Sequence, residues 1–161
     1  MRTCRSLASV TVVFLGALAT DVLADEWYVA AKLGPMIVDS AAVDDPINAG
    51  VQLSYKWTHT IGELGLEAEY TNSINRGQAD GADLSIETAT VYGAFRTAGP
   101  VYLKARLGAT SNTIELGDES EHGIATAVGG GIGFHVWYLQ IEFAYTRISQ
   151  DLDFVAVSLQ F

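Results

Sequence analysis

Acidic and basic residues stand inside segments of this sequence that otherwise carry mostly apolar and small side chains. Two pairs have members two residues apart. The residues of this kind are Lys32, Glu67, Glu69, Lys104, Arg106 and Glu142. Residues two apart in a β-strand point to the same side, and an isolated buried charge is costly. The spacing therefore predicts an ion-pair network on one enclosed face.

Hydrolytic chemistry is the other possibility that the residue types raise. Ser120 and His122 lie two residues apart next to Glu119 and Glu121, and a serine, a histidine and a carboxylate can form a nucleophilic triad. An acidic loop would not hold them in fixed positions. The glycines of 129–133 lack the Lys-Ser/Thr ending of a phosphate loop, and no Asp-x-Asp-x-Asp loop indicates calcium. We expect no catalytic residue, metal or cofactor.

Strands must position the charged residues, because apolar and polar residues alternate with period two along most of the chain. The clearest case is 47–57, which alternates without interruption. For the segment 84–96 the alternation does not decide which face is apolar. The eight predicted strands are 27–38, 47–57, 62–71, 84–96, 101–110, 124–134, 137–148 and 154–161.

The predicted connections alternate between long and short. The short ones are centred on 58–60, 98–100 and His135-Val136, whereas 39–46, 72–83 and 111–122 are longer and polar. Most loop acids fall in the long connections and in the last one, namely Asp39, Asp44, Asp45, Asp80, Asp83, Glu115, Asp118, Glu119, Glu121 and Asp151. In an up-and-down barrel such connections lie at opposite rims.

Composition limits the class of protein. The formal net charge is −10, which disfavours nucleic acid as a partner. Arg2 and Arg5 precede an apolar run, and Val22-Leu23-Ala24 suits a signal peptidase. We therefore predict a signal peptide at 1–24, which includes the only cysteine, Cys4, and a barrel domain at 25–161. The mature chain has no long apolar run that would predict a membrane helix.

Closing eight such strands removes the unpaired edges that lipid cannot satisfy. The charged stripe fits a narrow interior, and aromatic residues near strand ends are typical of interfacial girdles. We predict an all-β, eight-stranded antiparallel up-and-down transmembrane β-barrel. A secreted lipocalin-like carrier also has eight strands, but it would place the apolar face inside.

The Trp27-Tyr28-Val29 opening, the Gly129–Phe134 strand and the terminal Phe161 resemble the small eight-stranded outer-membrane β-barrel proteins of Gram-negative bacteria, such as OmpA-like barrel domains and porin-family proteins. The resemblance implies residence in the outer membrane, with lipid and lipopolysaccharide as surroundings. It also implies that the barrel-assembly machinery reads Phe161. We expect no peptidoglycan-binding domain of the OmpA type in this protein.

The sequence thus indicates a monomeric outer-membrane protein, not an enzyme, with a structural role and a surface role through acidic outer loops toward an unidentified extracellular partner. An eight-stranded barrel is filled by side chains, which favours a purely structural ion-pair network. The alternative is a gate, in which exchange of ion-pair partners opens a narrow ion path.

Overall fold

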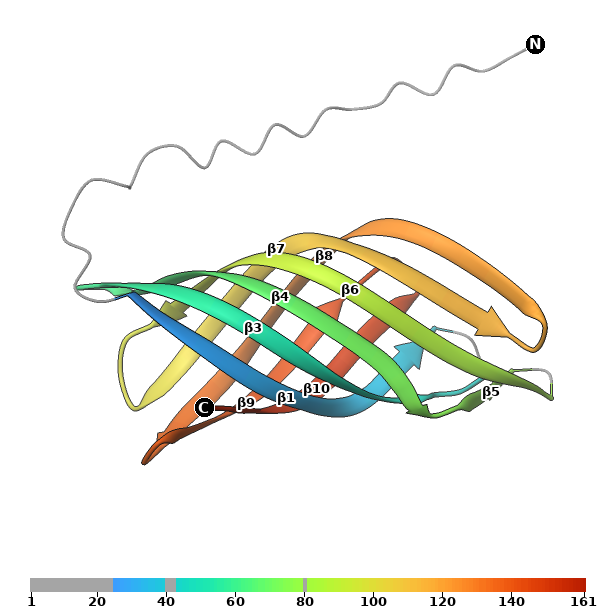
Figure 1. Cartoon of the computed structure of the whole chain (residues 1–161), viewed down its shortest axis with the longest axis horizontal. Coiled ribbons are helices and arrows are strands. Elements are labelled where there is room, and N and C mark those ends of the chain that lie inside the picture. The colour runs from blue at the N-terminus through green and yellow to red at the C-terminus, as the bar shows by residue number, and fades with distance from the viewer. Residues whose placement is uncertain (1–24, 40–42, 80) are drawn as a thin grey trace, which may run out of the picture.

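The computed structural model describes residues 25–39, 43–79 and 81–161, which form one antiparallel sheet that closes into a barrel (Figure 1). The strands are β1 (Asp25–Val38), β2 (Val43–Asp44), β3 (Ile47–His59), β4 (Gly62–Asn75), β5 (Gly77–Ala79), β6 (Ala82–Thr97), β7 (Val101–Leu116), β8 (Glu119–Val136), β9 (Leu139–Arg147) and β10 (Leu152–Gln160). The eight long strands form the wall, as predicted. No helix in the described part of the chain could span a membrane.

Pairing between the first and last strands closes the barrel. β1 pairs with β3 on one side, where Ala31 lies opposite Val51, and with β10 on the other, where Ala31 lies opposite Leu159. Apart from the pair of β1 and β10, each long strand neighbours the long strands before and after it in the chain, including β6 and β7. This is the predicted up-and-down topology.

The two ends of the barrel differ. Three tight turns, at 60–61, 98–100 and 137–138, define what we call the turn end. The connections after β1, β4, β7 and β9 define the loop end. Two of these connections contain a short strand: β2 lies in the connection after β1, and β5 lies in the connection after β4. β5 pairs with β2 on one side and with β6 on the other. The alternation of long and short connections is therefore present, although the long ones are partly ordered as sheet.

The turn predicted at the centre of 111–122, around Gly117–Glu119, is present, but the residues on either side of it form strand, so the connection is shorter than expected. β7 and β8 continue as a ladder up to Leu116 and Glu119, and only Gly117 and Asp118 form the turn. Gly117 has a φ of +59°, which glycine tolerates readily. Cross-strand contacts explain the extension, since the Thr113 hydroxyl lies 2.8 Å from Nδ1 of His122. The acidic residues of this segment are thus held on a hairpin.

The turn predicted at His135-Val136 lies two residues later, at Trp137 and Tyr138. His135 and Val136 remain in the ladder opposite Gln140 and Leu139. Trp137 adopts a φ of 56° and is 96% exposed. Neither glycine nor proline marks this turn in the sequence, and the apolar run conceals it. Trp137 therefore sits at the turn tip and not within a strand.

Apolar side chains cover the outside of the barrel. Leu53 and Leu103 are 45% and 61% exposed, whereas their neighbours Gln52 and Lys104 are buried. The last strand follows the same pattern, with Val155, Val157, Leu159 and Phe161 outward. At the turn end Tyr55 contacts the rings of Trp27 and Trp57, with centroid distances of 4.8 Å in a tilted pair and 4.9 Å in an edge-to-face pair. The lipocalin-like alternative is therefore excluded, because it requires the opposite arrangement.

The interior is divided into two zones. Toward the turn end and the middle it is polar and charged. Toward the loop end the described residues include no buried charge, and an apolar cluster lies beside a few buried polar side chains such as Asn48. The cluster consists of Met36, Leu84, Ile86, Ile148, Leu152, Phe154 and Ala156. The enclosed face was predicted to be polar throughout, so the apolar cluster is a correction to that prediction. Leu84 and Ile86 belong to β6, whose facing the alternation could not decide.

Candidate functional site

Strand alternation brings the six predicted network residues into the interior. β1 supplies Lys32, β4 supplies Glu67 and Glu69, β7 supplies Lys104 and Arg106, and β9 supplies Glu142; all six are buried. Three glycines of β8 lie beside two of these residues and beside Tyr102, and one of them leaves space for the Tyr102 ring. Gly129, Gly131 and Gly133 lie opposite Arg106, Lys104 and Tyr102, and an added Cβ at Gly133 would lie 2.1 Å from Cζ of Tyr102.

Glu67 and Glu142 form the centre of the network. Lys104 Nζ lies 2.8 Å from Oε1 of Glu67 and 3.0 Å from Oε1 of Glu142. Arg96 Nη2 lies 3.4 Å from a carboxylate oxygen of each of the same two residues. Tyr102 adds a hydroxyl that donates to Glu142 over 3.2 Å. Two acids and two bases therefore form a closed set of four ion pairs.

A second group surrounds Glu69. Arg106 Nη1 donates to Oε2 of Glu69 over 2.7 Å, and Lys32 Nζ donates to the same oxygen. The Arg106 guanidinium also donates from Nε to the Thr146 hydroxyl over 3.1 Å and lies 4.3 Å from the centroid of the Tyr92 ring. Arg106 links the two groups, because it also lies 4.0 Å from Glu67.

Two further cations extend the network toward the turn end, and the predicted site did not include them. Arg96 Nη1 donates to the side-chain oxygens of Gln140 and Gln160 over 3.0 and 2.9 Å. Lys56 Nζ lies 3.4 Å from the same oxygens and 3.6 Å from the centroid of the Tyr28 ring. The sequence did contain a signal for Arg96. If the large apolar Val91 and Phe95 are assigned to the outside of the strand, alternation places Arg96 inside.

Buried cations outnumber buried carboxylates among the described residues. The bases are Lys32, Lys56, Arg96, Lys104 and Arg106, and the acids are Glu67, Glu69 and Glu142. A partly exposed acid, Glu63, lies 3.8 Å from Lys56 and offsets part of the excess. Arg96 and Lys56 also contact aromatic faces and amide oxygens, which stabilise cations without adding negative charge.

The Ser120 and His122 pair lies on the β7–β8 hairpin, exposed and opposite Glu115 and Thr113. His122 contacts the Thr113 hydroxyl through Nδ1. Within the described residues, no group of three or more His, Cys, Asp or Glu side chains could hold a metal ion. Phe161 is 63% exposed, and its backbone N–H and C=O both bond to Val29.

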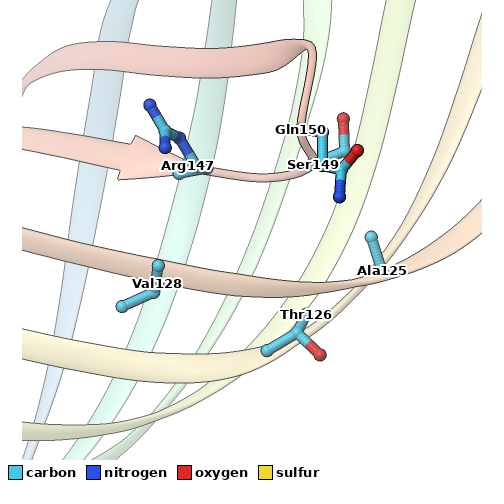
Figure 2. A pocket seen from close by; sticks show the side chains of 6 residues that line it. All are labelled: Ala125, Thr126, Val128, Arg147, Ser149 and Gln150. Atoms are coloured by element: carbon cyan, nitrogen blue, oxygen red, sulfur yellow. The ribbon is translucent and has the colours of Figure 1, made fainter.

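A shallow pocket opens at the loop end between β8 and the β9–β10 turn. Figure 2 shows its lining, which consists of Ala125, Thr126, Val128, Arg147, Ser149 and Gln150. Arg147 donates from Nε to Asp153 over 3.2 Å and from Nη2 to the Tyr145 hydroxyl over 3.2 Å. The other exposed basic residue at this end, Arg76, lies 3.5 Å from Asp83. Both arginines are therefore paired with acids at this rim.

Most of the predicted loop acids are exposed at the loop end, including Asp39, Asp45, Glu119 and Glu121. Asp80 and the predicted signal peptide at 1–24 lie outside the described residues. The molecule thus combines a filled interior with an acidic rim.

Comparisons with known proteins agree with this architecture. Neisserial surface protein A, NspA, has 16% sequence identity and a TM-score of 0.57, over 85% of this chain and 97% of NspA. Ail, the attachment invasion locus protein of Yersinia pestis, has 17% identity and a TM-score of 0.54 over the same shares. The structure of Ail in complex with the heparin analogue sucrose octasulfate has 18% sequence identity and a TM-score of 0.53, over 85% of this chain and 97% of Ail. These similarities support the fold.

A search of the curated proteins finds no match. The family model of the outer membrane protein beta-barrel domain matches residues 6–161, which is nearly the whole chain. The protein therefore belongs to the outer membrane β-barrel family and resides in the bacterial outer membrane.

Proposed function

We propose that this protein is a non-enzymatic, monomeric outer-membrane protein whose interior is a structural plug and whose acidic loop end interacts with other molecules at the cell surface. The observation that carries the proposal is the contrast between the two parts. The interior bases and acids are occupied with one another, whereas the acids of the loop end are exposed.

The apolar cluster supports the plug over the gate. Any ion that crossed the barrel would have to leave the charged zone and pass Met36, Ile86 and Phe154, each of which is completely buried. Moving an ion past apolar side chains costs many kcal/mol unless polar groups compensate it. The buried amide beside them, Asn48, is already bonded to Thr71, Ser73 and the backbone of Ile86. Exchange of ion-pair partners around Glu67 would not remove this barrier, because the cluster contains no charged side chain.

The charge of the loop end supports a surface role. Long connections of outer-membrane barrels face the outside of the cell, and we assign the loop end to that side. The two arginines at this rim are paired with Asp83 and Asp153, so the remaining acids give it a negative field. The name of NspA describes a surface protein and that of Ail describes attachment, which fits such a role here.

The sequence resemblance also assigns Phe161 to recognition by the barrel-assembly machinery. In support, Phe161 ends the outward apolar stripe of β10 and is more than half exposed. Outer-membrane lipid and lipopolysaccharide would contact this stripe and the outward side chains of the other strands. The closed ring needs no partner chain to satisfy its edges, which supports a monomer.

Two measurements test the proposal. Reconstituted in planar bilayers, the protein should give a flat current trace, and stepwise conductance would instead favour the pore. For the surface role, cells carrying the protein should bind positively charged beads, and the quadruple variant D39N/D45N/E119Q/E121Q should bind them several-fold less. The turn-end variant E63Q is the matched control and should bind beads like the wild type. Equal bead binding by all three proteins would contradict a surface role for the loop acids.

A further inference from the structure

β8 extends beyond its neighbour β9 at the loop end. The ladder between them begins at Val128, which lies opposite Arg147, whereas β8 pairs with β7 as far as Glu119. Among the described residues, 119–127 therefore pair on one side only. Figure 1 shows this extension as the orange end of β8, which projects past the ends of β9 and β10. The space that a longer β9 would occupy is open and could hold about nine residues.

A free strand edge exposes backbone groups that favour another strand. Successive residues direct their N–H and C=O groups alternately to the two sides of a strand, so roughly half of those in 119–127 point toward the open side. The base of this edge is the pocket of Figure 2, which Ala125 and Thr126 of β8 line together with Ser149 and Gln150 of the β9–β10 turn. The edge and the pocket together form a continuous seat for an extended chain.

The side chains of the seat differ between its two faces. Glu119 and Glu121 lie on the face that continues the barrel interior, because they have the same parity as the inward Ala127. The other face presents His122, Ile124 and Thr126, and Ile124 is 86% exposed. The sequence contains no lysine or arginine between Arg106 and Arg147. A strand added here would therefore meet two carboxylates on one face and the exposed Ile124 between polar side chains on the other.

A second copy of this chain does not fit the seat. A second copy would bring the same edge, which has no lysine or arginine to pair with Glu119 and Glu121 and adds two more carboxylates. Like charges on neighbouring strands are destabilising. The occupant must be a different polypeptide whose charge complements the edge.

We propose that the edge of β8 between Glu119 and Ala127 binds an extended segment of a partner protein, in which lysine or arginine alternates with β-branched apolar residues, as an added antiparallel strand. Main-chain hydrogen bonds would supply affinity, and the alternate side chains would supply specificity. The basic residues would lie beside Glu119 and Glu121, and the apolar ones beside Ile124. This inference rests on the proposed surface role and specifies the site that carries it.

The probe for this site is the capped peptide Thr-Lys-Val-Lys-Ile-Lys-Val-Thr, added to the full protein in phospholipid nanodiscs. Its partner probe is the same peptide methylated on the backbone nitrogens of its six central residues, which keeps the charge but removes the donors. We expect the first peptide to bind at least tenfold more tightly than the second. We also expect it to slow amide hydrogen exchange in 119–127.

Charge reversal tests the side-chain register. The variant E119K/E121K should lose at least tenfold in affinity for the lysine peptide and should gain affinity for a peptide in which the three lysines are glutamates. The matched control is E115K/D118K, which changes the net charge equally but alters the outward face of β7 and the turn. This control should retain most of the affinity for the lysine peptide.

Three results would overturn the inference. They are equal binding of the methylated peptide, equal effects of the two charge reversals, and absence of binding by either peptide. In each case, loss of bead binding by the quadruple acid variant would still support the surface role, so the two proposals can fail separately.

Discussion

Glu67 holds the centre of the interior network, and its removal should strongly destabilise the barrel. Its carboxylate lies 2.8 Å from Lys104, 3.4 Å from Arg96 and 4.0 Å from Arg106, and all four side chains are buried. In Glu67→Ala, the five buried bases would be left with two buried acids, Glu69 and Glu142.

The magnitude follows from the burial of these charges. Removing one partner of a buried ion pair costs about 3–5 kcal/mol, because the other charge stays buried without compensation. At about 1.4 kcal/mol for each factor of ten, the folding equilibrium should fall by about 10²–10⁴-fold. Removing Lys104 as well should restore part of the loss, so E67A/K104M should be less destabilised than the sum of the single variants by at least about 1 kcal/mol.

Guanidinium unfolding in phospholipid vesicles measures the change. The three tryptophans, Trp27, Trp57 and Trp137, supply the fluorescence signal. Asp153→Asn is the control, because it breaks the largely exposed pair with Arg147 and should leave the midpoint unchanged. If Glu67→Ala shifted the midpoint no more than this control, the interior ion pairs would not contribute to the free energy of unfolding. The interior could then not be regarded as a structural plug.

Three further changes have defined outcomes. Gly133→Ala should destabilise the barrel by about 1–3 kcal/mol through overpacking against Tyr102, and the double variant with Tyr102→Leu should recover part of this loss in the same unfolding assay. Phe154→Ala should cost about 3–5 kcal/mol by leaving a cavity in the apolar cluster, and it should raise bilayer conductance if that cluster is the seal. Deletion of Phe161 should lower the amount of protein in isolated outer membranes, whereas refolding of the purified protein into detergent should continue, since only two backbone bonds to Val29 are lost.

Much of the fold could be predicted from period-two alternation, because lipid outside and charge inside impose opposite demands on neighbouring residues. Leu53 beside Gln52 and Leu103 beside Lys104 satisfy both demands, and their facing was correct. The pattern was uninformative where this contrast disappears. In β6, threonine is tolerated on either side, so the inward positions of Thr88 and Thr90 needed the register with β4 and β7.

The parts of the site that the sequence did not reveal depend on length and on three-dimensional neighbours. Nothing local in Leu84 or Phe154 shows that they meet across the barrel to form the apolar cluster. The charged residues near Gly117 suggested a loop, although the ladder continues through them. β8 is longer than β9 at the loop end, and this difference creates the open edge. It could not be predicted from the sequence, because it depends on the register in which the two strands pair.

The seam between β1 and β10 has a consequence for folding. Ala30 pairs with Gln160, so the contacts that complete the ring join regions from opposite ends of the sequence. Such nonlocal contacts make folding slow, since the entropy of ordering the intervening chain is lost before they form. Until β10 docks, the nascent sheet has two open margins that hydrocarbon cannot solvate. Stability must therefore arrive in one late, cooperative step, and a holding factor would have to shield the sheet until then.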